Sequence, residues 1–143
     1  MIGDICTKPA ITVAMTASVE DAARIMRGRK VGALIVTNGP RPVGILTDRD
    51  ITVDVVAAGK EPAGTKVADV MRRNPTTLRE DDGLLDAAKL FSAKGVRRLP
   101  VTSKGGRLIG IVTLDDLMML LGREMELLGT AVAHGMGRPR LAG

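Results

Sequence analysis

The sequence predicts an α+β fold in which two β-α-β-β-α units pack through their sheets about a pseudo-two-fold axis. The main observation is an internal repeat, since GILTDRD at residues 44–50 returns as GIVTLDD at residues 110–116. The apolar segment 31–36 also returns, at residues 96–101, with an offset of 65 instead of 66. One residue inserted in the turn of the second unit accounts for the difference. Any ligand site in one unit is therefore expected to have a counterpart in the other.

The elements of the first unit each have a local signal. Ser18 is predicted to be the N-cap of an amphipathic helix, because Asp21 follows three residues later and apolar residues recur as far as Met26. The apolar runs 33–36 and 43–46 flank an Asn-Gly-Pro turn, which predicts a β-hairpin. A short strand at 11–13 precedes these elements, and a helix at 48–58, capped by Thr47, follows them.

The second unit is predicted to repeat this order after a segment rich in glycine and proline. Its elements are a strand at 77–78, a helix at 83–93, hairpin strands at 99–101 and 108–112, and a helix from Leu114 that extends to Leu128. From Ala131 to the end the chain has three glycines and a proline, so a frayed tail is expected. The predicted boundaries are 6–59 for the first unit, 60–70 for a linker, 71–122 for the second unit, and 123–143 for a helical extension and flexible tail.

The composition excludes several classes of protein. A chain of 143 residues with 45% apolar residues can bury a core without a disulfide, and Cys6 has no second cysteine to pair with. No apolar run approaches the roughly 20 residues of a membrane helix, and no secretion signal is evident, so a cytoplasmic location is expected. The net charge of +5 is modest and scattered, and Phe91 is the only aromatic residue, so a nucleic-acid partner is not favoured.

The two Gly-Ile-(Leu/Val)-Thr-x-x-Asp segments, each after a hairpin, resemble a tandem pair of cystathionine-β-synthase (CBS) domains. The segment VRRLPV at residues 96–101 contributes to the resemblance, which covers residues 6–122. It implies two clefts between the sheets, with an adenine nucleotide such as AMP, ADP or ATP, or another adenosyl compound, as the ligand class. It also implies flat dimers of such modules.

The repeated threonine and aspartate suit such a ligand chemically. Thr47 and Thr113 stand at strand-to-helix junctions, where a hydroxyl and free amide groups can hold a phosphate oxygen. Asp50 and Asp116 lie three residues further on, and an ionised carboxylate can accept both hydrogens of a ribose cis-diol. The alternative is a capping box in each unit, which satisfies the helix start without any ligand.

Small residues near the apolar strands form a second group of candidates, because they would let the edge of a base reach backbone groups. These residues are Thr12, Val13, Gly32 and Ala33 in the first unit and Thr77 and Leu78 in the second.

The two units differ where Arg97 and Arg98 of the second correspond to Gly32 and Ala33 of the first, so the two clefts cannot carry the same charge. Arginine forks bind phosphate oxygens, and the resemblance implies that both arginines contact phosphate. Since adjacent strand residues point to opposite faces, the pattern alone allows at most one to enter a given cleft. The alternative is a solvated pair on an edge strand. Arg72 and Arg73, next to the start of the second unit, could also help to hold phosphate, but surface solvation is favoured for them.

The leading hypothesis is a regulatory or sensor module without an effector domain, acting as a homodimer on a separate effector protein. The alternative is a structural or dimerisation module of the same fold with no physiological ligand. An enzyme is not predicted, because the sequence has no recognisable nucleophile and base pair, and no cofactor is required. A zinc site is not predicted either, since His134 and Cys6 are isolated in the sequence.

Overall fold

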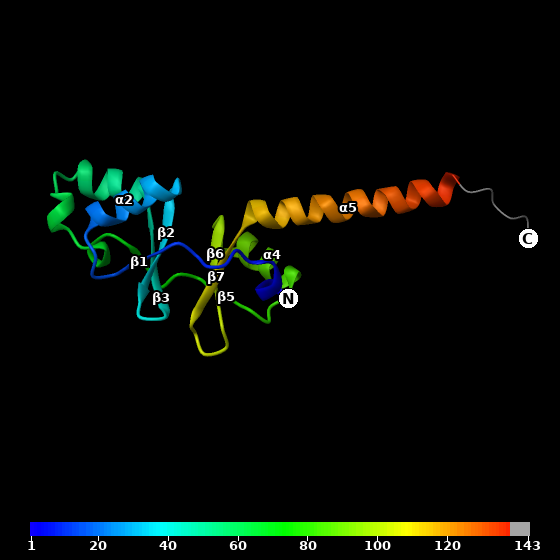
Figure 1. The fold of residues 1–143 in the computed structure, drawn as a ribbon, viewed down its shortest axis with the longest axis horizontal. Helices are drawn as coiled ribbons and strands as arrows, with labels where there is room; N and C mark the ends of the chain where they lie inside the picture. Colours follow the sequence, from blue (N-terminus) through cyan, green and yellow to red (C-terminus); the bar gives the residue numbers. More distant parts are fainter. Residues whose placement is uncertain (138–143) are drawn as a thin grey trace, which may run out of the picture.

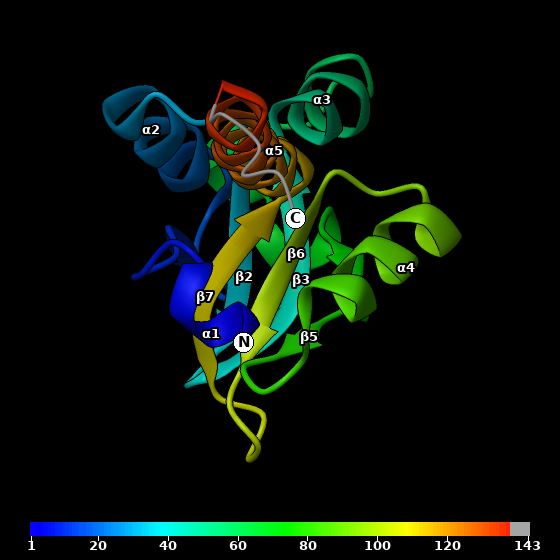
Figure 2. The same cartoon turned by 90° about the vertical axis from the view of Figure 1, so that its right-hand side faces the viewer.

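The computed structural model describes residues 1–137 and has the predicted α+β architecture, with two sheets and helices on their outer sides (Figure 1). The first sheet has four strands in the order β1-β2-β3-β4, and the second has three in the order β5-β6-β7. The two sheets lie side by side in Figure 1 and overlap in Figure 2, so they are stacked face to face. The Leu108 amide joins the two hairpin turns by donating to the Pro40 carbonyl oxygen at 2.8 Å.

The first unit follows the predicted order. Its elements are β1 (Thr12–Ala14), α2 (Val19–Arg29), β2 (Ala33–Asn38), β3 (Arg41–Thr47), α3 (Asp48–Ile51) and the π-helical turn η1 (Thr52–Val56). The Ser18 hydroxyl caps α2 by accepting the Asp21 amide at 3.0 Å. The predicted helix at 48–58 is instead a single α-turn followed by the wider η1, and it ends two residues earlier.

The second unit has the same order. Its elements are β5 (Leu78–Arg79), α4 (Leu84–Lys94), β6 (Arg98–Thr102), β7 (Leu108–Thr113) and α5 (Leu114–Gly137). The hairpins begin at Ala33 and Arg98 and end at Thr47 and Thr113, which confirms that the inserted residue lies in the second turn.

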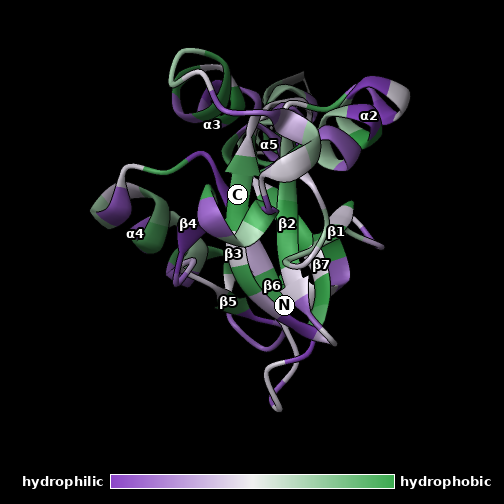
Figure 3. Ribbon diagram, turned by 90° about the vertical axis from the view of Figure 1, so that its left-hand side faces the viewer, coloured by the Kyte–Doolittle hydropathy of each residue, from purple (hydrophilic) through white to green (hydrophobic). Residues whose placement is uncertain are grey.

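Each unit has its own apolar core between its sheet and its helices. Leu34 and Val36 of β2 belong to the first core, and Leu99 and Val101 of β6 belong to the second. Ile35 is only 2% exposed although it alternates with Leu34 and Val36, so the opposite face of β2 is covered too. Figure 3 shows the apolar residues concentrated in these central strands.

The segment before each unit packs on the other unit. The N-terminal helix α1 (Ile2–Ile5) places Ile2, fully buried, in the second core, and Thr7 pairs with Ile111 of β7. The segment containing η3 (Val67–Asp69) and β4 (Arg72–Arg73) packs on the first unit, where β4 extends the sheet beside β3. The predicted linker at 60–70 therefore ends in residues that belong to the first core, after the short turn η2 (Pro62–Gly64).

Each of these two segments, called the crossing segments below, lies close to the last hairpin strand of the unit on which it packs. The glycine of the repeated motif in that strand makes the close approach possible. A Cβ at Gly44 would stand 2.9 Å from the Arg72 carbonyl oxygen, and one at Gly110 would stand 2.5 Å from the Thr7 carbonyl oxygen. No side chain fits at such distances unless the crossing segment moves.

The last helix is longer than predicted. The frayed tail expected from Ala131 is wrong for residues 131–137, which continue α5, while residues 138–143 lie outside the described part of the chain. Among the described helices, none combines the length and apolar composition needed to cross a bilayer.

Candidate functional site

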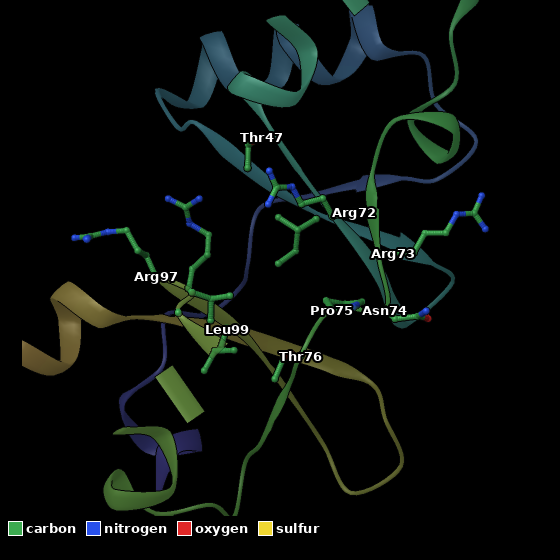
Figure 4. Close-up of a pocket in the computed structure, with 12 residues that line it drawn as sticks. Thr47, Arg72, Arg73, Asn74, Pro75, Thr76, Arg97 and Leu99 are labelled. Carbon is green, nitrogen blue, oxygen red and sulfur yellow. The ribbon is translucent and has the colours of Figure 1, made fainter. Parts of the chain in front are cut away.

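A cavity of about 370 Å³ lies between the two units, within the size range of small-molecule sites. The first unit lines it with the end of β3, with β4 and with the turn that follows, and the second unit lines it with residues 95–99 (Figure 4). Thr47, Arg97 and Arg98 of the predicted site are among its lining residues.

The backbone amides at the start of α3, beside the cavity, already have hydrogen-bond acceptors within the chain. The Thr47 amide donates to the Asp50 carboxylate at 3.0 Å, and the Asp50 amide donates to the Thr47 hydroxyl at 3.1 Å. The amides of Asp48 and Arg49 also have acceptors, the Gly32 carbonyl and the Asp48 carboxylate. These amides are therefore not free in the structure, and the phosphate contact predicted at this helix start stays a prediction. The Thr47 hydroxyl accepts one hydrogen bond, but its own hydrogen is left to donate into the cavity.

Asp50 is placed behind this helix start and does not line the cavity. Its carboxylate is 6% exposed, and its second oxygen accepts from Nε of Arg72 at 3.3 Å. With both oxygens engaged, Asp50 is placed to position Thr47 and Arg72, whereas the sequence predicted contact with a ribose. Because only Nε of Arg72 is used, its two terminal nitrogens remain as donors. Figure 4 shows Arg72 reaching toward Thr47, while Arg73 points away.

The opposite wall carries two more guanidinium groups. Arg97 pairs with Asp115 at 3.1 Å, and both side chains are exposed, so solvent weakens this pair. Among the described residues, no carboxylate oxygen lies within 4.0 Å of Arg98. Both arginines line the cavity, in agreement with the resemblance. Arg97 precedes β6, so the rule that neighbouring strand residues point to opposite faces does not apply to it.

The corresponding residues of the other unit differ in charge. Thr7 corresponds to Arg72, and Lys8 corresponds to Arg73. Residues 32–33 correspond to residues 97–98. A Cβ at Gly32 would lie 3.0 Å from the Asp48 carboxylate, so an acidic group lies where the second unit presents Arg97. The corresponding position of the other unit therefore lacks the four guanidinium groups that line the cavity.

Thr113 and Asp116 form the same capping box in the second unit. The Asp116 amide donates to the Thr113 hydroxyl at 3.0 Å, and the Thr113 amide donates back to the Asp116 carboxylate at 3.3 Å. Asp116 is exposed, in contrast to Asp50. The capping alternative considered for both pairs is thus realised in the structure.

The remaining predicted residues are not among those that line the cavity. The side chains of Val13 and Leu78 are in the two cores, at 5% and 1% exposed, so only their backbone atoms are available to a ligand. Thr12 and Thr77 line two other, shallow depressions, and Ala33 begins β2 opposite Thr47.

Sequence reasoning favoured surface solvation for Arg72 and Arg73 over a phosphate contact. Both are exposed, and both line the cavity. Their place follows from the pairing of β4 with β3, a contact between segments more than twenty residues apart. The apolar wall formed by Ile45, Val96 and Leu99 was also missed. Its signal was present in the sequence, because Ile45 and Val96 lie within the repeated segments.

Comparison with known proteins identifies this architecture. The family model described as CBS domain matches residues 2–56 and 67–123, and the chain therefore belongs to the CBS domain family. It is a tandem pair of such domains.

Individual relatives agree with this assignment. Protein MK0525 of Methanopyrus kandleri is 35% identical over 120 residues, which cover 83% of this chain and 61% of that protein. The crystal structure of CBSX2 in complex with AMP has a TM-score of 0.73 and 28% identity, covering 87% of this chain and 97% of that one. The CBS domain pair of protein MJ0100, in complex with 5′-methylthioadenosine and S-adenosyl-L-methionine, has a TM-score of 0.74 and 30% identity over the same shares.

Proposed function

We propose that this chain is a regulatory module that binds an adenine nucleotide in the basic cleft between its two units. The observation that carries the proposal is the cavity lined by the Thr47 hydroxyl and by guanidinium groups from both units. A ligand bound there would touch both units at once. Binding would therefore favour one relative arrangement of the units over others.

The phosphate end of the nucleotide is assigned to the arginines. The free terminal nitrogens of Arg72 and the guanidinium of Arg98 can donate to phosphate oxygens, with the Thr47 hydroxyl as a further donor. Arg97 can exchange its exposed partner Asp115 for phosphate at little cost. The partly exposed apolar side chains of Ile45 and Val96 provide a surface for the base. The complexes of CBSX2 with AMP and of MJ0100 with adenosyl compounds support this ligand class.

The second cleft is proposed to stay empty or to take a less charged adenosyl ligand, because Gly32 and Ala33 replace the two arginines there. The module is proposed to act in the cytoplasm as a homodimer and to signal to a separate effector protein. Its role is regulatory and not catalytic, and it needs no bound cofactor to fold. The alternative remains a dimerisation module without a physiological ligand.

Isothermal titration calorimetry with adenosine, AMP, ADP and ATP tests this proposal. AMP is expected to bind more tightly than adenosine, and Arg97→Ala/Arg98→Ala is expected to lose about tenfold or more in AMP affinity, since hydrogen bonds to charged groups contribute about 1.5–3 kcal/mol. Arg107→Ala, an exposed arginine outside the cleft, is the matched control and should bind AMP as the native protein does.

Two results would contradict the proposal. An unchanged affinity in the double variant would remove the arginines from the site. A melting temperature that does not respond to millimolar adenosine compounds would favour the dimerisation module, because a ligand selective for the native state must raise it.

A further inference from the structure

The helix α5 projects far beyond the body of the protein (Figure 1). It has 24 residues and is therefore about 36 Å long. Leu117 near its start is buried in the second core, but every described residue from Leu121 to Met136 is exposed. Most of the helix thus has no packing partner within the described chain.

One face of this projecting helix is apolar. Its side chains recur three or four residues apart, which is the spacing of a helix–helix seam. They are Met118, Leu121, Met125, Leu128, Val132 and Met136, and they are 43–81% exposed. At 100° per residue, Arg123 and Glu126 fall on the opposite side of the helix.

The helix needs this face to be covered. Gly122, Gly129 and Gly135 lie within it, and each glycine is about 1 kcal/mol less favourable than alanine in a helix. In proteins most of the stability of a helix comes from packing of its apolar face and not from helix propensity. Packing of the apolar face can offset that deficit.

We infer that the apolar face of α5 pairs with the same face of α5 in a second copy of the chain. Burying one such side chain removes on the order of 100 Å² from water, so six on each helix remove on the order of 1,200 Å² together, which reaches the range of stable interfaces. The glycines beside the seam allow the two backbones to approach closely. A lipid surface does not fit, because Arg123 is the only Lys or Arg in α5, against four acidic residues.

This inference rests on the dimer in the proposed function and assigns its interface. The full-length chain is tested by size-exclusion chromatography with light scattering over a range of micromolar concentrations. The native protein is expected at twice the 15.0 kDa of one chain. The seam variant Met125→Glu/Leu128→Glu is expected at the mass of one chain, with a weaker helical circular dichroism signal.

The matched control uses two apolar residues on the other side of the same helix. Met119 and Leu127 are 72% and 65% exposed, so Met119→Glu/Leu127→Glu adds the same charge at similarly exposed positions. This variant is expected to remain dimeric. A dimeric seam variant, a monomeric control variant or a monomeric native protein would each overturn the inference. The last result would mean that another molecule covers this face.

Nucleotide titrations separate this inference from the proposed ligand site. The seam variant leaves the cleft residues unchanged, so its AMP affinity is expected to equal that of the native protein. Retained dimerisation in Arg97→Ala/Arg98→Ala, together with lost AMP binding, would show that the two sites are independent. Failure of one proposal is thus visible without failure of the other.

Discussion

Gly110→Ala is expected to detach the N-terminal segment from the second unit. The added Cβ would lie 2.5 Å from the Thr7 carbonyl oxygen and 2.8 Å from Sγ of Cys6. The Thr7 carbonyl cannot move away without separating the segment from β7, because Thr7 and Ile111 exchange two backbone hydrogen bonds of 2.9 and 3.0 Å.

The expected loss follows from what the segment contributes. Burying Ile2, which is fully buried, stabilises the fold by about 2–3 kcal/mol. The two backbone hydrogen bonds contribute about 1 kcal/mol each. The variant should therefore lose up to about 5 kcal/mol, a large part of the 5–15 kcal/mol that is usual for a domain.

Urea unfolding followed by circular dichroism measures this loss. Gly28→Ala is the control, because a Cβ there meets nothing within 4 Å and alanine should stabilise α2 by about 1 kcal/mol. A chain that lacks residues 1–8 should tolerate Gly110→Ala with little further loss. If Gly110→Ala unfolds at the same urea concentration as the native protein, the close approach does not constrain the fold as described.

Other changes test the helix starts and the thiol. Asp50→Asn should lower the free energy of unfolding in urea by about 1.5–3 kcal/mol, because Asp50 is buried and accepts hydrogen bonds from Thr47 and Arg72. Asp116→Asn should cost much less, because Asp116 is exposed. Equal losses in the two variants would contradict this difference. Ser18→Ala should lower the free energy of unfolding by about 1 kcal/mol through loss of the α2 cap, and no change would exclude that contribution. Burial raises the pKa of the Cys6 thiol. The rate of its alkylation should therefore rise with pH at a higher midpoint in the folded protein than in an unfolded peptide. A lower midpoint in the folded protein would contradict the burial of this thiol.

The local pattern of the sequence was enough to predict the order of elements in both units. Periodicity, caps and turn residues act over a few neighbours, so Ser18, the hairpin at 33–46 and the inserted residue were all assigned correctly. The crossing of the leading segments was not predictable in this way. Nothing near Ile2 in the sequence indicates that its partners are Leu78 and Leu99.

In the candidate site, too, the features that depend on the repeat were predicted, and the contacts between distant segments were not. Thr47 and Arg98 were found because the repeat and the difference between its copies mark them. The pair of Asp50 with Arg72 was missed, because it depends on β4 lying beside β3. The length of α5 was underestimated because glycines are read as helix breakers, although they are compatible with a helix that packs closely on another.

The comparison of the two units separates residues that build the fold from residues that could serve a ligand. Thr47 and Thr113 make the same capping contacts, and Gly44 and Gly110 admit the same crossing segment, so the repeated motif is explained by structure alone. The differences between the units have no such explanation. The four arginines that line the cavity belong to neither apolar core, and only Arg72 among them pairs with a buried group, Asp50. Residues that break the internal symmetry are therefore the ones at which the function of this chain is to be sought.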